Sequence, residues 1–196
     1  MIREIEDLKL KYETCYDEVS RMKDEIIRYE FSKGGDVFFR GMYTPYLTFE
    51  RKMFSNYQGR FIKNTQNFTF KYGFDKNDKL IYVLRNLDGF YFEEYILHNV
   101  DHEIGLCYSK NKHYLSEVNV CKFHNNLLKS VCHAHIMEWL ENRYSFDITE
   151  ELYTYDDNGL FSIENITGET RYPTRYHSLY EFEKNTFILK NQWISK

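Results

Sequence analysis

A four-residue phrase, in which Phe or Tyr is followed three positions later by asparagine, recurs six times in this chain of 196 residues. Its copies begin at Phe61, Phe74, Tyr108, Phe123, Tyr155 and Phe182. Every copy except the first lies between runs rich in Tyr, Phe, Ile, Val and Thr, which favour β-strands. Asparagine tolerates the positive φ of a tight turn, and Lys, Asp or Asn precedes it in all six copies. The phrase therefore predicts a series of β-hairpins.

The copies are separated by 13, 34, 15, 32 and 27 residues, and this irregular spacing excludes a solenoid with one constant repeat. A meandering antiparallel sheet fits the pattern better. We expect its strands near residues 36–43, 46–51, 68–74, 79–85, 90–97, 104–109, 114–123, 127–136, 147–155, 160–166, 176–183 and 186–193.

Residues 127–144 allow two interpretations. Residues 135–142 could form a short helix because their apolar side chains fall at helical spacing, whereas His133 and His135 alternate as they would in a strand. We favour a strand that breaks near Met137, and the structure of residues 135–146 stays open at this stage.

The N-terminal segment has a different character, with apolar residues spaced alternately three and four positions apart up to Gly34 and Gly35. This spacing predicts a long amphipathic helix. Its apolar seam consists of Ile5, Leu8, Tyr12, Cys15, Val19, Met22, Ile26 and Tyr29. The seam either packs across one face of the chain's own sheet or pairs with a second copy in a homodimeric coiled coil, and the flanking charges favour neither interpretation.

The expected fold class is therefore mainly β (α+β). A long N-terminal amphipathic helix in residues 1–33 precedes a large, curved antiparallel β-meander sheet in residues 36–196. We expect both parts to form a single structural domain, because a chain of this length can bury a sizeable core without disulfides.

Composition excludes several classes of partner. With 26 basic and 30 acidic residues the formal net charge is −4, so no general positive field would hold a nucleic-acid backbone. No apolar run approaches the about 20 residues that cross a bilayer, so we expect no membrane partner. Four widely spaced cysteines and the charged residues after Met1 are typical of a reduced, cytoplasmic protein.

The best candidate for a metal site joins two segments across one hairpin turn and consists of Cys121, His124, His133 and His135. Thiolate and imidazole are the usual zinc ligands, but strand parity brings only a subset such as His133 and His135 to one face. We therefore favour packing roles for this group and keep a metal-dependent enzyme as the alternative. No serine or cysteine lies in a Gly-flanked elbow and no Gly-rich loop could cradle a phosphate, so we expect no catalytic residues and no cofactor.

Tyrosine is unusually frequent, with 18 copies, and each buried hydroxyl needs a hydrogen-bond partner. We expect many tyrosines at half-exposed positions, where they either stabilise the sheet as cross-strand pairs or bind a partner protein. The residues expected to contact a partner are Tyr91, Tyr95, Tyr153, Tyr155, Arg171 and Arg175. A charged connection between strands explains the two arginines equally well.

The segments Tyr153–Phe161 and Tyr72–Ile81 resemble the hairpin units of MORN-variant and YD-type repeat proteins. In those proteins an aromatic-Asp-x-Asn-Gly-x-Leu turn links consecutive strands, and here only the copy at Tyr155 keeps the Asn-Gly pair. Bacterial members of these families include antitoxin-like and immunity-like proteins, so the resemblance implies a protein-binding role without catalytic residues. Together these features predict a non-catalytic binding module that holds a protein partner, such as a basic toxin domain, on an aromatic and acidic surface.

Overall fold

The computed structural model describes residues 2–34, 37, 59–63, 65–87, 89–140, 143–157, 159–172, 174–183 and 186–195. This part of the chain begins with two short α-helices, α1 (Ile2–Tyr12) and α2 (Tyr16–Ser20), and a 3₁₀ helix, η1 (Arg21–Glu25). The strands that follow are β1 (Arg28–Lys33), β2 (Arg60–Phe61), β3 (Phe70–Phe74), β4 (Leu80–Leu87), β5 (Phe90–His98), β6 (His102–Ser109), β7 (Leu115–His124), β8 (Leu127–Leu140), β9 (Arg143–Asp156), β10 (Gly159–Glu169), β11 (Arg175–Glu183) and β12 (Thr186–Ser195).

All twelve of these strands belong to one antiparallel sheet with the order β12-β11-β10-β9-β8-β7-β6-β5-β4-β3-β1-β2. From β3 to β12 each strand pairs with the next along the chain, so the expected meander is confirmed. These ten strands coincide with the ten predicted between residues 68 and 193. Apart from Val37, the predicted strands 36–43 and 46–51 lie outside the described residues.

Residues 127–140, for which the sequence allowed a helix or a strand, form strand β8. Strand β8 continues to Leu140 because Ile136 pairs with Phe146 and Met137 pairs with Ser145 of β9. The predicted break near Met137 is therefore wrong, and the register shifts only between Glu138 and Leu140.

The turns show why the aromatic-x-x-Asn phrase marks strand ends. Between β7 and β8, Asn125 and Asn126 both have positive φ, 50° and 62°, as a two-residue hairpin turn of type I′ requires. After the copies that begin at Phe74 and Tyr108 the turns are longer, and the positive φ falls on Asp78 (61°) and His113 (54°). In these three described turns, asparagine supplies the left-handed residue itself only in the tight one.

The predicted N-terminal helix is confirmed only in part. Helix α1 ends at Tyr12, a turn through Cys15 separates it from α2, and helical structure stops at Glu25. Residues 28–33, which the seam placed in the helix, form strand β1 and pair with β3 instead. Tyr29 and Phe31 satisfy a strand's alternation as well as a helical seam, and the exposed hydrogen-bonding edge of β3 decides between them.

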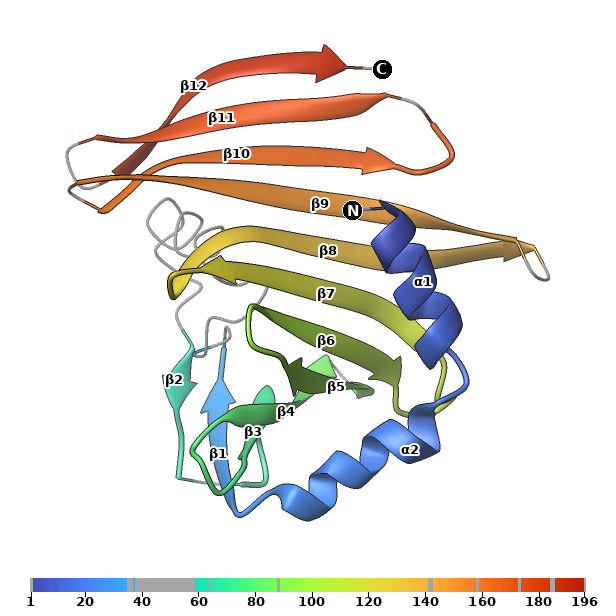
Figure 1. Ribbon diagram of the computed structural model, residues 1–196. Coiled ribbons are helices and arrows are strands. Elements are labelled where there is room, and N and C mark those ends of the chain that lie inside the picture. Colours follow the sequence, from blue (N-terminus) through green and yellow to red (C-terminus); the bar gives the residue numbers. More distant parts are fainter. Residues whose placement is uncertain are drawn as a thin grey trace.

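The helices lie against one face of the curved sheet, which we call the inner face; the opposite face is the outer face (Figure 1). On the inner face Ile5 of α1 and Val19 of α2 pack into the main core beside Tyr95, Leu106 and Val118. The strands also bury side chains on the outer face, in two smaller clusters. Among the described helices none has the length and apolar character that spanning a bilayer demands.

A buried carboxylate fastens the helices to the sheet. Glu93 of β5 is only 2% exposed, and it accepts hydrogen bonds from the hydroxyls of Tyr16 (2.5 Å), Tyr82 (2.8 Å) and Tyr95 (3.2 Å). The Lys23 ammonium of η1 lies 3.3 Å from the same carboxylate. Because Tyr16 and Lys23 belong to the helical segment and the other donors to the sheet, this cluster fixes how the helices lie on the inner face.

Candidate binding surfaces

The predicted metal ligands are dispersed in the structure. Cys121 is buried on the outer face among Leu128, Val131 and Tyr153, and His124 is exposed at the end of β7. His133 and His135 of β8 do share the outer face, but His133 binds Asn119 and His135 is exposed. The described residues contain no group of three or more His, Cys, Asp or Glu side chains that could hold a metal ion.

His133 belongs to a polar chain that sequence reasoning missed. Its Nδ1 lies 2.6 Å from the Asn119 side-chain oxygen, and the Asn119 amide donates to Glu94 at 2.8 Å. Burial lowers the pKa of His133, so the ring is neutral at pH 7 and donates from Nδ1. Glu94 and Asn119 are buried, which makes this chain across β5, β7 and β8 a structural network.

Two of the tyrosines expected to contact a partner are inside the protein. Tyr95 has no exposed surface and Tyr153 is also buried, because Glu93 and Glu151 accept the hydrogen bonds of their hydroxyls. Their predicted role as contact residues is therefore corrected to core packing. Tyr155 and Tyr91 are half-buried, and the Tyr155 hydroxyl donates to the Leu128 carbonyl at 2.7 Å.

The two arginines organise a connection between strands. The Arg175 guanidinium donates to the carbonyls of Glu169 (3.2 Å), Tyr172 (2.9 Å) and Thr174 (3.1 Å). Arg171 forms an ion pair with the Glu169 side chain. Both side chains therefore stabilise the turn between β10 and β11, as the alternative interpretation expected.

The apolar seam faces the sheet. Ile5 and Val19 are buried in the inner core, and five further members pack against it, namely Leu8, Tyr12, Cys15, Met22 and Ile26. Tyr29 is the exception, since it lies on β1 and is exposed. This packing matches the interpretation in which the helical segment covers its own sheet.

The inner face continues past the helices on strands β9 to β12. Helix α1 lies over β7 to β9, whereas none of the described helices covers β10 to β12 (Figure 1). Cross-strand pairing places Glu150, Ile166, His177 and Trp193 in one row across these four strands. We call this region the acidic inner surface, and it comprises Glu150, Leu152, Glu164, Ile166, His177, Leu179, Glu181, Ile188 and Trp193.

Carboxylates outnumber cations on this surface. Burial raises the pKa of the Glu150 carboxyl; the positive charges of the N-terminal ammonium and Lys122 oppose this, and the negative charges of Glu164 and Glu4 add to it. Glu150 makes no hydrogen bond or ion pair with another described residue. The Lys122 ammonium is bound by Glu4 at 2.6 Å, so it is already neutralised. Glu150 is thus a half-buried carboxylate without a bonded cation among the described residues, and the charges of both signs around it act without direct pairing.

An ordered aromatic pair adjoins these carboxylates. His177 lies between Glu164, 2.9 Å from its Nδ1, and Ser195, 2.7 Å from its Nε2. Its ring stacks on the Trp193 indole with the centroids 4.9 Å apart and the planes 15° apart. These contacts hold Trp193, which is 38% exposed, at a fixed orientation beside the negative charges.

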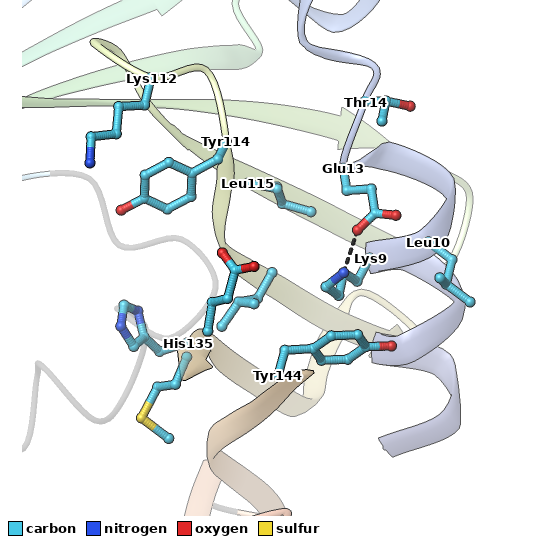
Figure 2. A pocket seen from close by; sticks show the side chains of 12 residues that line it. Lys9, Leu10, Glu13, Thr14, Lys112, Tyr114, Leu115, His135 and Tyr144 are labelled. Atoms are coloured by element: carbon cyan, nitrogen blue, oxygen red, sulfur yellow. Dashed lines mark hydrogen bonds and ion pairs between the residues drawn. The ribbon is translucent and has the colours of Figure 1, made fainter. Parts of the chain in front are cut away.

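A pocket of about 940 Å³ lies at the C-terminal end of α1 (Figure 2). On one side Lys9 forms an ion pair with Glu13, and its ammonium lies 3.9 Å from the centre of the Tyr144 ring. On the other side the wall carries Lys112, Tyr114 and His135 (Figure 2). Charges of both signs and apolar side chains line it together, so this pocket suits an amphipathic group and has no distinct preference for an anion or a cation.

Comparison of the chain with protein-family models, with curated proteins and with solved structures found no match. The similarity to MORN-variant and YD-type proteins therefore rests on the hairpin phrase alone and stays a prediction.

Proposed function

We propose that this protein is a non-catalytic protein-binding module that holds a basic segment of a partner on the acidic inner surface. In its concrete form it is a bacterial immunity or antitoxin protein that acts in the cytoplasm and covers a basic toxin domain. The observation that carries the proposal is the Glu150 carboxylate, which has no bonded partner among the described residues, lies next to Glu164 and shares one cross-strand row with the exposed Trp193.

The energetic argument has two parts. Burial is the main cause of the raised Glu150 pKa, so a cation of the partner that approaches Glu150 and Glu164 stabilises the charged carboxylate, and this attraction also accelerates association. Trp193 and the aliphatic side chains of Leu179 and Ile188 supply the apolar contact area from which most of an interface's affinity comes. A basic segment with interspersed apolar residues complements both features.

Comparative capture from an extract of the protein's own source tests this proposal. The baits are the wild-type protein, the double variant Glu150→Lys/Glu164→Lys and the control Asp17→Lys/Glu18→Lys, which makes the same change of net charge on exposed positions of α2. Circular dichroism and thermal unfolding establish that all three baits are folded.

We expect one basic protein to bind the wild type and the control, to be lost from the Glu150→Lys/Glu164→Lys bait, and to dissociate as salt is raised. A partner that binds the double variant as tightly as the wild type would contradict the assigned surface. Absence of any partner at micromolar protein concentration would count against the binding function itself.

A further inference from the structure

A second charged site lies elsewhere on the inner face, around the buried carboxylate of Glu93. Three lysines from different parts of the chain lie around it, near enough for their charges to act on one another: Lys23 of η1, Lys71 of β3 and Lys110 after β6. Lys71 pairs with Leu84, and Leu84 pairs with Glu93, so Lys71 lies on the same face as Glu93, two strands or about 10 Å away. The site is separate from the acidic inner surface and does not depend on the proposed function.

Aromatic rings hold two of these lysines. The Lys71 ammonium lies 3.7 Å from the centre of the Tyr29 ring and 6.0 Å from that of Phe31. The Lys110 ammonium lies 5.5 Å from the centre of the Tyr91 ring, and its backbone amide donates to the Tyr91 carbonyl at 3.0 Å. The rings attract the ammonium groups, but they carry no negative charge that would neutralise them.

The buried Glu93 carboxylate is already occupied by other partners. A carboxylate offers about four lone-pair sites, and Glu93 accepts three tyrosine hydroxyls and approaches Lys23 at 3.3 Å. Neither Lys71 nor Lys110 makes a hydrogen bond or ion pair through its ammonium with any other residue in the described part of the chain. Within the described residues, these two positive charges therefore have no bonded anion.

The lysines are close enough to affect one another. Burial lowers the pKa of Lys71, and the charges of Lys110 and Lys23 lower it further, against the opposing effect of Glu93. Such a cluster of ammonium groups is stabilised by an anion that binds between them. The Lys23 side chain is 34% exposed, so a ligand can reach the site from solvent.

We propose that Lys71, Lys110 and Lys23 form a binding site for a phosphate group. A dianion matches the two unpaired ammonium charges better than a single carboxylate does, and lysine is a common phosphate ligand in proteins. The rings of Tyr29 and Tyr91 beside the lysines favour a phosphate carried by an aromatic group. Inorganic phosphate and an aryl phosphate ester are the two sources of this chemistry.

The test is a titration of the full chain with inorganic phosphate, phenyl phosphate and acetate, followed by the NMR signals of its lysine side chains. Lys71→Met and Lys110→Met remove one ammonium each, and the exposed Lys110 provides a variant that keeps the interior intact. Lys129→Met is the matched control, because the Lys129 ammonium also lies over a tyrosine ring, 4.9 Å from the centre of Tyr155, but on the outer face.

We expect saturable binding of both phosphates, weaker binding of acetate, and a Lys71 ammonium that titrates at higher pH in the complex. Each of the two site variants should weaken binding at least about tenfold, whereas Lys129→Met should change it less than about twofold. Tighter binding of phenyl phosphate would identify an aromatic ester as the ligand, and equal affinities would identify free phosphate. No saturable binding, or equal losses in all three variants, would overturn the proposal.

Discussion

Replacing Glu93 with glutamine removes the charge of the group that joins the helices to the sheet while keeping its size. Glu93 is buried, and its three tyrosine donors and Lys23 are arranged around a carboxylate. The substituted amide still accepts through its oxygen, but its NH₂ group faces hydroxyls that were donors. We therefore expect Glu93→Gln to fold with a reduced free energy of unfolding.

The magnitude follows from the contacts. A hydrogen bond to a charged group contributes about 1.5–3 kcal/mol and a neutral one about 0.5–1.5, so each tyrosine bond loses about 1 kcal/mol. The ion pair with the partly exposed Lys23 adds little because solvent screens it. Relief of the carboxylate's desolvation offsets part of this loss, which leaves about 2–3 kcal/mol at pH 7. For a chain of this size the melting temperature should fall by about 5–10 °C.

The loss should also depend on pH. Burial opposes ionisation of Glu93, but hydrogen bonds from Tyr16 and Tyr82 and the charge of Lys23 outweigh it and hold its pKa below the ordinary value. A depressed pKa in the folded state stabilises the protein fully above the unfolded pKa of about 4.3, and the contribution disappears as pH falls through the folded value. The stability gap between wild type and variant should therefore be constant from neutral pH to about 5 and close below about 4.

Urea denaturation at several pH values, with tryptophan fluorescence and circular dichroism as probes, measures this gap. Tyr82→Phe is the companion variant, since it removes one donor at 2.8 Å and keeps the charge, and it should cost about 1–2 kcal/mol. A loss below about 0.5 kcal/mol for Glu93→Gln, or a gap that persists unchanged at low pH, would refute this account of the cluster.

Three further predictions concern a turn residue, a glycine of the sheet and the cysteines. Asn126 has a φ of 62°, so Asn126→Val should destabilise the protein by about 1–2 kcal/mol while Asn126→Gly stays near wild type, as urea denaturation would show. In Gly105→Ala the new Cβ would clash with the Glu94 carboxylate oxygen and lie 3.2 Å from the Asn119 Cβ, so the same assay should register a loss of about 1–3 kcal/mol. Burial raises the pKa of the Cys107 and Cys132 thiols to about 12, and Cys121 is buried as well. At pH 8, alkylation followed by mass spectrometry should therefore label only the partly exposed Cys15 in the native protein.

Much of the fold can be read from local sequence, because a hairpin needs only alternation and a suitable turn. The Asn125-Asn126 turn is recognisable for this reason. Strand β1 cannot be recognised from local sequence, because Tyr29 and Phe31 fit both a helical seam and a strand. Only pairing with β3 distinguishes the two structures. Tertiary contacts rather than local propensity decide whether such a segment forms a helix or a strand.

The candidate site is less accessible to sequence reasoning. Glu150, His177 and Trp193 come together only through the register of three successive strand pairs, and a shift of one residue would place them on opposite faces. The Glu93 cluster gave a partial signal, since Glu93 and Tyr95 alternate on one strand face. Two of its other donors, Tyr16 and Lys23, come from a helical segment about 70 residues earlier, and no local pattern connects them to Glu93.

Hydroxyl-radical footprinting of the captured complex tests the central claim most directly, because it reports side-chain exposure on each face of the same strands. Trp193 is 38% exposed on the acidic inner surface, whereas Tyr176 and Ile194, 57% and 63% exposed, form a cross-strand pair on the outer face. We predict that the partner protects Trp193 and leaves Tyr176 and Ile194 as reactive as in the free protein. Protection of Tyr176 and Ile194 with unchanged oxidation of Trp193 would contradict the proposed binding surface.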